Sequence, residues 1–289
     1  MSIYAILEGF RLIKKGAICM GYIEQKWKSQ NGDFIIKDKY HSMRMMPRNP
    51  VTRERRKKRT GKTTELQEKI NLRHRTEKLA RLIMDNFQPG DWWISFKLKE
   101  VVSLDRFKDE YEKMIRRLRG FFKKHNKELK YIAVHENICG RGRLHGHILL
   151  PTIPGVFFPA MKKALEKAWT LGDCHFQPYE GKAMDAMKVA AYMTKEDVIT
   201  TKLNEKAKLL QEGGDTKALD AEIRAKRSRI CPSQNLIRTK PVKKQIKSAD
   251  TYSDKMTPPK GYHLVKALSY NGYTVDGYPY QHAVYERDG

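Results

Sequence analysis

The stretch YIAVHENICGRGRLHGHILL, residues 131–150, indicates the fold of the chain most directly. Its two ends, 131–136 and 144–150, are short apolar runs of the kind that form β-strands. The seven residues between them carry two glycines among polar and basic side chains, a composition typical of a turn. The stretch therefore predicts two antiparallel strands joined as a hairpin.

Helical and strand-like segments alternate on both sides of this hairpin. Before it, a helix over 63–87 ends at the breaker Pro89-Gly90-Asp91, a strand covers 92–98, and a second helix begins near Ser103. After it come a helix over 159–171, a strand over 173–178 and a helix over 184–196. The order β-α-β-β-α-β-α predicts an α+β fold: a central antiparallel sheet, a palm like those of ferredoxins and RRM domains, with helices packed on one face.

The charge of the chain points to a polyanion as its partner. The 289 residues carry 58 Lys and Arg against 33 Asp and Glu, a formal net charge of +25. The excess is +12 over residues 1–90, +6 over 91–199 and +7 over 200–289. The middle segment is closest to neutral and has the most regular apolar pattern, so we expect the folded core there and phosphate-holding surfaces on either side.

Several classes of protein are excluded by the sequence. No run approaches the roughly 18–20 apolar residues of a membrane span, and residues 1–22 lack the pattern of a secretory signal. The four cysteines are far apart and form no C-x-x-C motif, which argues against a zinc ribbon or a disulfide framework. We therefore expect a soluble protein in the cytoplasm of its cell, with reduced cysteines and no membrane partner.

Composition suggests four segments. They are a basic N-terminal extension (1–62), a folded domain (63–200), a helical segment broken by Gly213-Gly214 (201–229) and a basic C-terminal extension (230–289). The first extension contains a dense block of like charge that resists packing: Arg55, Arg56, Lys57, Lys58 and Arg59. This block is either a phosphate-binding arm or a solvated linker, and the two interpretations have equal weight.

His145-Gly146-His147 is the sharpest local motif for chemistry. Residues two apart on a strand point to the same face, so both imidazoles can reach one ion while Gly146 faces the other way. Glu136, on the preceding strand, can complete a site of two imidazoles and one carboxylate that suits Mn²⁺ or Mg²⁺. His135 is the rival third ligand, but alternation places it and Glu136 on opposite faces. Oxygen is preferred by a hard cation that works on a phosphate, which favours Glu136.

A nucleophile is suggested by the pattern Tyr-x-x-Lys, which occurs three times. Tyr179/Lys182 lies in a loop-like segment and Tyr252/Lys255 in a polar stretch. Tyr192/Lys195 alone lies in a plausible helix, where a spacing of three places both side chains on nearly the same face. Without the histidine pair, Tyr192 would be interpreted as an ordinary residue at the rim of an amphipathic helix.

Taken in order, these motifs resemble those of the HUH endonucleases, most closely the single-tyrosine rolling-circle replication initiators of small bacteriophages and plasmids. The resemblance covers about residues 63–200. Its motifs are Trp93-Ile94-Ser95-Phe96, Glu136, Gly142 to His147, and Ala191 to Lys195. The chain departs from the pattern at Gly146, where a bulky apolar residue is usual, and this leaves the packing of that strand open.

The resemblance implies a metal-dependent, sequence-specific endonuclease and ligase of single-stranded DNA. Mn²⁺ or Mg²⁺ at Glu136, His145 and His147 would activate the origin phosphate, and Tyr192 would form a 5′-phosphotyrosine with help from Lys195. A bacterial host would supply helicase and DNA polymerase. Phosphate contacts are expected from Arg141 and Arg143, in the hairpin connection, and from the block 55–59.

Two other functions remain open from the sequence. A relaxase or single-tyrosine transposase would use the same chemistry on a different DNA target. A non-catalytic protein that binds single-stranded nucleic acid would also combine an antiparallel sheet, exposed aromatic residues and a basic surface.

Overall fold

The computed structural model describes residues 21–42, 63–137, 144–246, 252–274 and 277–289. The chain divides into two compact units. The central unit consists of Thr60–Thr239 together with Ser29–Asn31, and the terminal unit combines the residues that precede and follow it. Each unit is built on its own antiparallel sheet.

The sheet of the central unit has the strand order β6-β3-β5-β4-β7, and every neighbouring pair is antiparallel. The predicted hairpin is present as β4 and β5, and the predicted order of strands and helices from residue 92 to residue 194 is confirmed. The strands are β3 (Trp92–Phe96), β4 (Ile132–Glu136), β5 (His145–Leu150), β6 (Cys174–Pro178) and β7 (Arg229–Pro232). The α+β class with an antiparallel sheet is therefore correct.

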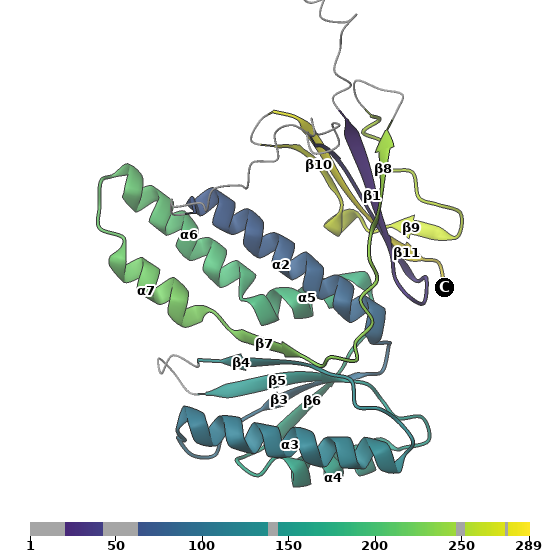
Figure 1. Cartoon of the computed structure of the whole chain (residues 1–289), viewed down its shortest axis with the longest axis vertical. Helices are drawn as coiled ribbons and strands as arrows, with labels where there is room; N and C mark the ends of the chain where they lie inside the picture. Colours follow the sequence, from purple (N-terminus) through teal and green to yellow (C-terminus); the bar gives the residue numbers. More distant parts are fainter. Residues whose placement is uncertain (1–20, 43–62, 138–143, 247–251, 275–276) are drawn as a thin grey trace, which may run out of the picture. The chain divides into compact units, whose positions relative to one another are not determined.

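Helices cover both faces of this sheet, so the expectation that they pack on one face is wrong. Figure 1 shows α3 and α4 on one side of the sheet and α2, α5, α6 and α7 on the other. All five residues of β4 are buried, which means that both of its alternating sets of side chains need cover. The helices are α2 (Glu65–Asn86), α3 (Leu104–Lys124), α4 (Phe158–Ala168), α5 (Ala183–Thr194), α6 (Glu196–Gln211) and α7 (Lys217–Lys226).

The main core lies between the sheet and the pair α3 and α4. Ser103 caps α3 as predicted, because its side chain accepts a hydrogen bond from the backbone N–H of Arg106 at 3.3 Å. The buried face of α3 consists of residues three or four apart: Phe107, Tyr111, Met114, Ile115, Leu118 and Phe122. They pack on alternate residues of the strands, among them Phe96 and Ile148. The opposite face of the same strands is thereby left for the polar groups described below.

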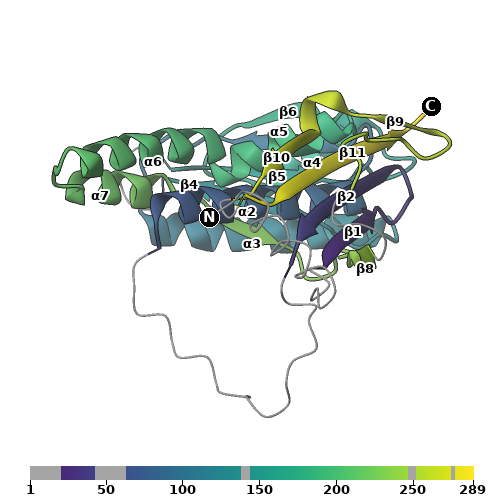
Figure 2. The same cartoon turned by 90° about the horizontal axis from the view of Figure 1, so that it is seen from above.

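Helices α6 and α7 form a hairpin and run side by side, as Figures 1 and 2 show. Gly213, at a φ of 73°, lies in the turn between them, where the sequence predicts a break. Lys206 of α6 binds Glu65 of α2 at 2.9 Å and Asp220 of α7 at 3.0 Å. The helical segment expected as a separate part is thus attached to the central unit.

The sheet of the terminal unit has the strand order β10-β11-β2-β1-β8, and β9 pairs with β11. All its pairings are antiparallel. Its strands are β1 (Tyr22–Lys28), β2 (Phe34–His41), β8 (Val242–Ile246), β9 (Tyr262–Leu264), β10 (Tyr270–Tyr273) and β11 (Pro279–Arg287), and a 3₁₀ turn, η4, covers Lys266–Leu268.

This arrangement differs from the segments expected from composition. The expected extensions 1–62 and 230–289 both contribute strands to the terminal sheet, since β2 pairs with β11. Strand β7, which lies within the expected C-terminal extension, completes the central sheet instead. Partners more than 200 residues apart leave no local signal in a sequence, so this pairing could not be seen there. Within the described residues, no helix is long and apolar enough to cross a membrane.

Asp91 fixes the turn that leads into β3, and this makes a prediction about stability. Its buried carboxylate accepts hydrogen bonds from the backbone N–H groups of Gln88 (2.8 Å) and Thr152 (2.7 Å) and from the Thr152 hydroxyl (3.1 Å). Asp91→Asn would turn an amide N–H₂ toward a donor, so we expect the free energy of unfolding to fall by about 1–3 kcal/mol. Urea denaturation measures this change.

The matched control is Asp173→Asn, since the Asp173 side chain is largely exposed. It is expected to change the free energy of unfolding by less than about 0.5 kcal/mol. Equal effects of the two variants would show that the Asp91 contacts do not stabilise the turn.

Candidate active site

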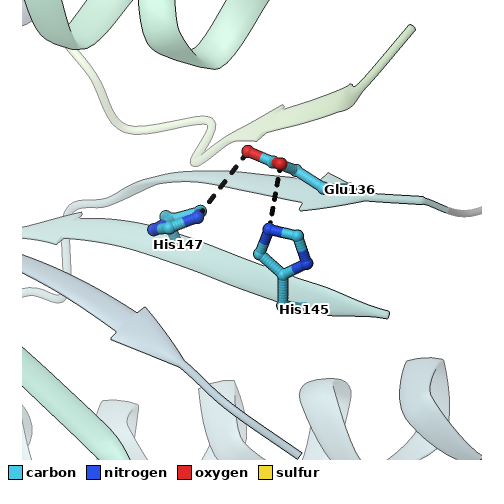
Figure 3. A group of neighbouring side chains, drawn as sticks. All are labelled: Glu136, His145 and His147. Atoms are coloured by element: carbon cyan, nitrogen blue, oxygen red, sulfur yellow. Dashed lines mark ion pairs between the residues drawn. The ribbon is translucent and has the colours of Figure 1, made fainter. Parts of the chain in front are cut away.

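Three potential metal ligands meet on one face of the central sheet. In the register of β4 and β5, Glu136 lies opposite His145, and Val134 lies opposite His147. The ligand atoms of Glu136, His145 and His147 all lie within 4.8 Å of one another. Figure 3 shows both imidazoles directed toward the carboxylate, with His145 Nε2 at 3.0 Å from Glu136 Oε2 and His147 Nε2 at 3.6 Å from Glu136 Oε1.

His135, the rival third ligand, lies on the opposite face of the sheet. Its ring packs edge to face on Tyr111 at 4.3 Å and on Phe107 at 5.3 Å between centroids. Burial, together with the nearby charge of Arg229, lowers the pKa of His135 to about 4. The structure therefore brings Glu136, and not His135, to the histidine pair.

Gly146 is accommodated by the same packing. A Cβ at this position would lie 3.3 Å from the carbonyl oxygen of Val134 and 3.5 Å from the Phe107 ring, with the His135 ring at 3.7 Å. Phe107 and His135 thus fill the space into which a larger side chain would extend. The open question about the packing of this strand is answered without any change on the metal-ligand face.

Tyr192 and Lys195 join the three ligands from α5 and from its C-terminal end. The Tyr192 hydroxyl lies 3.0 Å from His147 Nε2, and the tyrosine side chain remains partly open to solvent. Lys195 Nζ lies 2.7 Å from Glu136 Oε2 and 4.0 Å from the centroid of the Tyr192 ring. All five residues predicted for the metal and the nucleophile are therefore neighbours in space.

The backbone of Lys195 is unusual and sets its position. Lys195 has a φ of 58° and a ψ of 38°, the left-handed conformation, and it separates α5 from α6. This conformation costs a residue other than glycine about 1–2 kcal/mol. It ends α5 at Thr194, two residues before the predicted end. The turn holds the ammonium group beside both the phenol and the carboxylate.

Burial and neighbouring charges set the protonation of the site. Burial lowers the pKa of His147 to about 4, so its imidazole is neutral at pH 7. Burial opposes ionisation of Glu136, but hydrogen bonds from His145 and Lys195 outweigh it and lower the pKa of the carboxyl group. Burial and the charge of Glu136 raise the pKa of Tyr192 to about 12. The site thus presents a carboxylate, a neutral His147 imidazole and a protonated phenol.

These groups fit a divalent cation. Neutral imidazole and ionised carboxylate are the forms that bind metals. Glu136 Oε1 is buried and has no hydrogen-bond donor among the described residues, as expected of an oxygen reserved for another ligand. Two nitrogens and one oxygen from the protein form an incomplete coordination shell that can accept a substrate oxygen.

Two residues that orient His147 were not singled out in the sequence. Ser95 Oγ lies 2.8 Å from His147 Nδ1, and the Trp93 indole stacks on the imidazole with centroids 5.1 Å apart and planes 5° apart. Both had appeared only within the loose motif 93–96. Alternation along β3 places them on one face, but their contact with His147 depends on the register of β3 against β5.

Ser95 gives a prediction about metal affinity. Its contact with Nδ1 selects the tautomer of His147 and leaves Nε2 for a metal, and loss of such a contact weakens metal binding by about 10–100-fold. We expect Ser95→Ala to weaken Mn²⁺ binding to this extent, measured by calorimetric titration. Thr201→Ala, at an exposed hydroxyl of α6, serves as the control and should leave affinity unchanged. Equal affinity of the Ser95 variant and the unaltered chain would contradict the orienting role.

A hollow of about 230 Å³ opens beside Tyr192. It is lined by Trp93 of β3, by the end of β6 with the residue that follows, and by α5: Gln177, Pro178, Tyr179, Asp185, Lys188, Val189 and Tyr192. Its walls combine aromatic rings with polar side chains. A planar ring can stack in such a place.

The predicted phosphate contacts lie outside the described residues. Arg141 and Arg143 belong to 138–143, and the block Arg55, Arg56, Lys57, Lys58 and Arg59 belongs to 43–62. They remain predictions.

Comparison with known proteins connects this site with DNA replication. Searches of curated proteins and of solved structures found no match. Residues 91–197, which contain Ser95, Glu136, His145, His147, Tyr192 and Lys195, match the model of a family of replication-associated proteins, described by its member ORF2, in agreement with a role in the initiation of replication.

Proposed function

We propose that the chain is a metal-dependent endonuclease and ligase that nicks single-stranded DNA at a replication origin and starts rolling-circle replication. One observation carries the proposal. The Tyr192 hydroxyl lies 3.0 Å from His147 Nε2, on the sheet face where Glu136, His145 and His147 converge. A potential nucleophile and a potential metal site thus share one open location within the segment that matches the replication-associated family.

The covalent step is a transesterification. Tyr192 Oη attacks the phosphorus atom, the new Oη–P bond forms and the P–O3′ bond breaks. The phenol gives up its proton, and the departing 3′ oxygen takes one up. The products are a 5′-phosphotyrosine and a free 3′-hydroxyl, which a host polymerase can extend. Because the phosphoester bond is conserved in the adduct, the reverse attack by a 3′-hydroxyl rejoins the strand.

Each group of the site has a part in this step. Glu136, His145 and His147 would hold Mn²⁺ or Mg²⁺, which when bound would polarise the phosphate and offset its developing charge. Ser95 and Trp93 hold the His147 ring in place. Lys195 keeps a positive charge beside the phenol, where it can attract the substrate phosphate.

The surroundings of Tyr192 suit a single strand. Trp93 and Tyr192 present aromatic surfaces at the hollow, and unpaired bases stack on such rings. The charge of +25 supports a polyanionic substrate. Since the sequence has no Walker A motif, unwinding of a duplex would be the task of a host helicase.

The experiment is an assay for the covalent adduct. The full chain is incubated with a library of single-stranded oligonucleotides labelled at the 3′ end, with Mn²⁺ or with EDTA, and separated on a denaturing gel. A labelled band at the mobility of the protein, present with Mn²⁺ and absent with EDTA, is the expected result. Salt-sensitive binding without an adduct in Mn²⁺ or Mg²⁺ would show instead a non-catalytic nucleic-acid-binding protein.

A further inference from the structure

One face of the terminal sheet carries a cluster of lysines that form no ion pair with the described residues. Lys26 lies directly opposite Lys37 in the pairing of β1 and β2, and Lys39 and Lys28 follow on the same face at spacings of two. Lys244 of β8 lies on this face as well, because it pairs with Glu24, which also pairs with Lys39. We name these five residues the lysine face: Lys26, Lys28, Lys37, Lys39 and Lys244.

The lysine face is open to solvent, and its charge exceeds that of the acidic groups around it. Lys26, Lys28 and Lys244 are exposed, and Lys37 and Lys39 are partly exposed. Within the described part of the chain, none of the five has an ion pair within 4.0 Å, whereas lysines of the central unit such as Lys113, Lys195 and Lys206 do.

Like charges directly opposite one another destabilise a sheet. Burial, with Lys26 and Lys39 nearby, lowers the pKa of Lys37 although Glu24 acts in the opposite sense. An anion from outside the chain would relieve this repulsion.

Aromatic rings support two of these lysines. Lys37 Nζ lies 5.4 Å from the centroid of the Tyr285 ring, and Lys39 Nζ lies 5.3 Å from that of Tyr252. Cation–π contacts of this kind hold an ammonium group in place without neutralising its charge. The lysines are thereby kept available for an anionic ligand.

We infer that the lysine face is a second DNA-binding surface, which holds the phosphate backbone with residues that are not part of the candidate active site. Rows of lysines on neighbouring strands match a linear polyanion better than a single small anion. Contacts to phosphates add affinity without reading sequence. The lysine face would therefore keep DNA on the protein, and recognition of the origin would be left to other residues. This inference rests on the proposed function only for the choice of DNA as the polyanion.

The test compares two triple variants of the full chain that remove the same charge. One carries Lys26→Gln, Lys37→Gln and Lys39→Gln. The control carries Lys255→Gln, Lys260→Gln and Lys266→Gln, at exposed lysines of the terminal unit outside its strands. Affinity for a fluorescent oligonucleotide of mixed sequence, single-stranded in one arm and duplex in the other, is measured between about 50 and 200 mM salt. Thermal unfolding confirms that both variants fold.

Each phosphate contact contributes about 0.7–0.9 to the slope of log K against log salt. For at least one form of DNA, the first variant should lower this slope by about 2 to 3 and weaken binding about tenfold at low salt, and the control should show less than half of either change. Equal behaviour of the two variants in both arms would overturn the inference. So would unchanged DNA binding with lost binding to phosphatidylglycerol vesicles, which would assign the lysine face to a membrane surface.

Failure of this inference and failure of the proposed function can be told apart. The lysine variant should still form the covalent adduct when a cleavable oligonucleotide is saturating, because Tyr192 and the metal ligands are unchanged. Conversely, the salt slopes can be measured even if the unaltered chain forms no adduct.

Discussion

Tyr192→Phe is expected to abolish the covalent protein–DNA adduct, with a fall in its rate of formation of at least about a thousandfold. The substitution removes only the hydroxyl, which lies 3.0 Å from His147 Nε2. The ring that packs on Trp93 with centroids 6.0 Å apart and lies beneath Lys195 is retained. We therefore expect the affinity for single-stranded DNA to stay within about threefold, because stacking and phosphate contacts do not need the hydroxyl.

Tyr252→Phe is the matched control. Tyr252 has a lysine three residues later, as Tyr192 does, and belongs to the terminal unit. Its hydroxyl donates a hydrogen bond to the carbonyl oxygen of Lys39, so a small loss of stability is expected and no loss of adduct. An adduct that survives in Tyr192→Phe and disappears in Tyr252→Phe would refute the assignment of the nucleophile.

Glu136→Gln is expected to remove metal binding and nicking together. The amide keeps the size of the carboxylate but loses the charge, which Lys195 and His145 now contact at 2.7 and 3.0 Å. For the unaltered chain, Mn²⁺ at a hundred times its dissociation constant should add about 2.7 kcal/mol of stability. In Glu136→Gln this gain should vanish and adduct formation should fall below detection. His147→Ala should behave in the same way and leave DNA affinity nearly intact.

Thermal unfolding with and without Mn²⁺ measures the gain in stability independently of nicking. Glu100→Gln, at an exposed glutamate after β3, is the control and should keep both the gain and the adduct. A Glu136→Gln protein that Mn²⁺ stabilises as much as the unaltered chain would place the metal elsewhere. Loss of DNA affinity equal to the loss of nicking in His147→Ala would mean that the histidines are structural.

The parts of the site that strand alternation decides could be predicted from the sequence. Alternation placed His145 and His147 on one face and separated Glu136 from His135, and the structure has both arrangements. The contact between Tyr192 and His147 could be suspected only from the resemblance, because it depends on how α5 packs over the sheet. The role of Ser95 was missed for a similar reason, since the register of β3 against β5 is not encoded locally.

The errors at the level of the fold have the same origin. Apolar periodicity shows that α2 and α5 each have a face to bury, but it does not say against which side of the sheet. The strands of the terminal sheet are short and their partners distant, so charge dominated the interpretation of both ends of the chain. Local patterns thus predicted the elements of residues 92–194 well, and long-range pairing decided the rest.

The most direct test of the account is to locate the DNA within the adduct. Protein incubated with single-stranded oligonucleotides and Mn²⁺ is digested with a nuclease and a protease, and mass spectrometry identifies the peptide that carries the nucleotide. The account predicts a 5′-linked nucleotide on Tyr192 and on no other tyrosine. A nucleotide attached to a different residue, or a nicked strand with a free 5′-phosphate and no modified peptide, would contradict it.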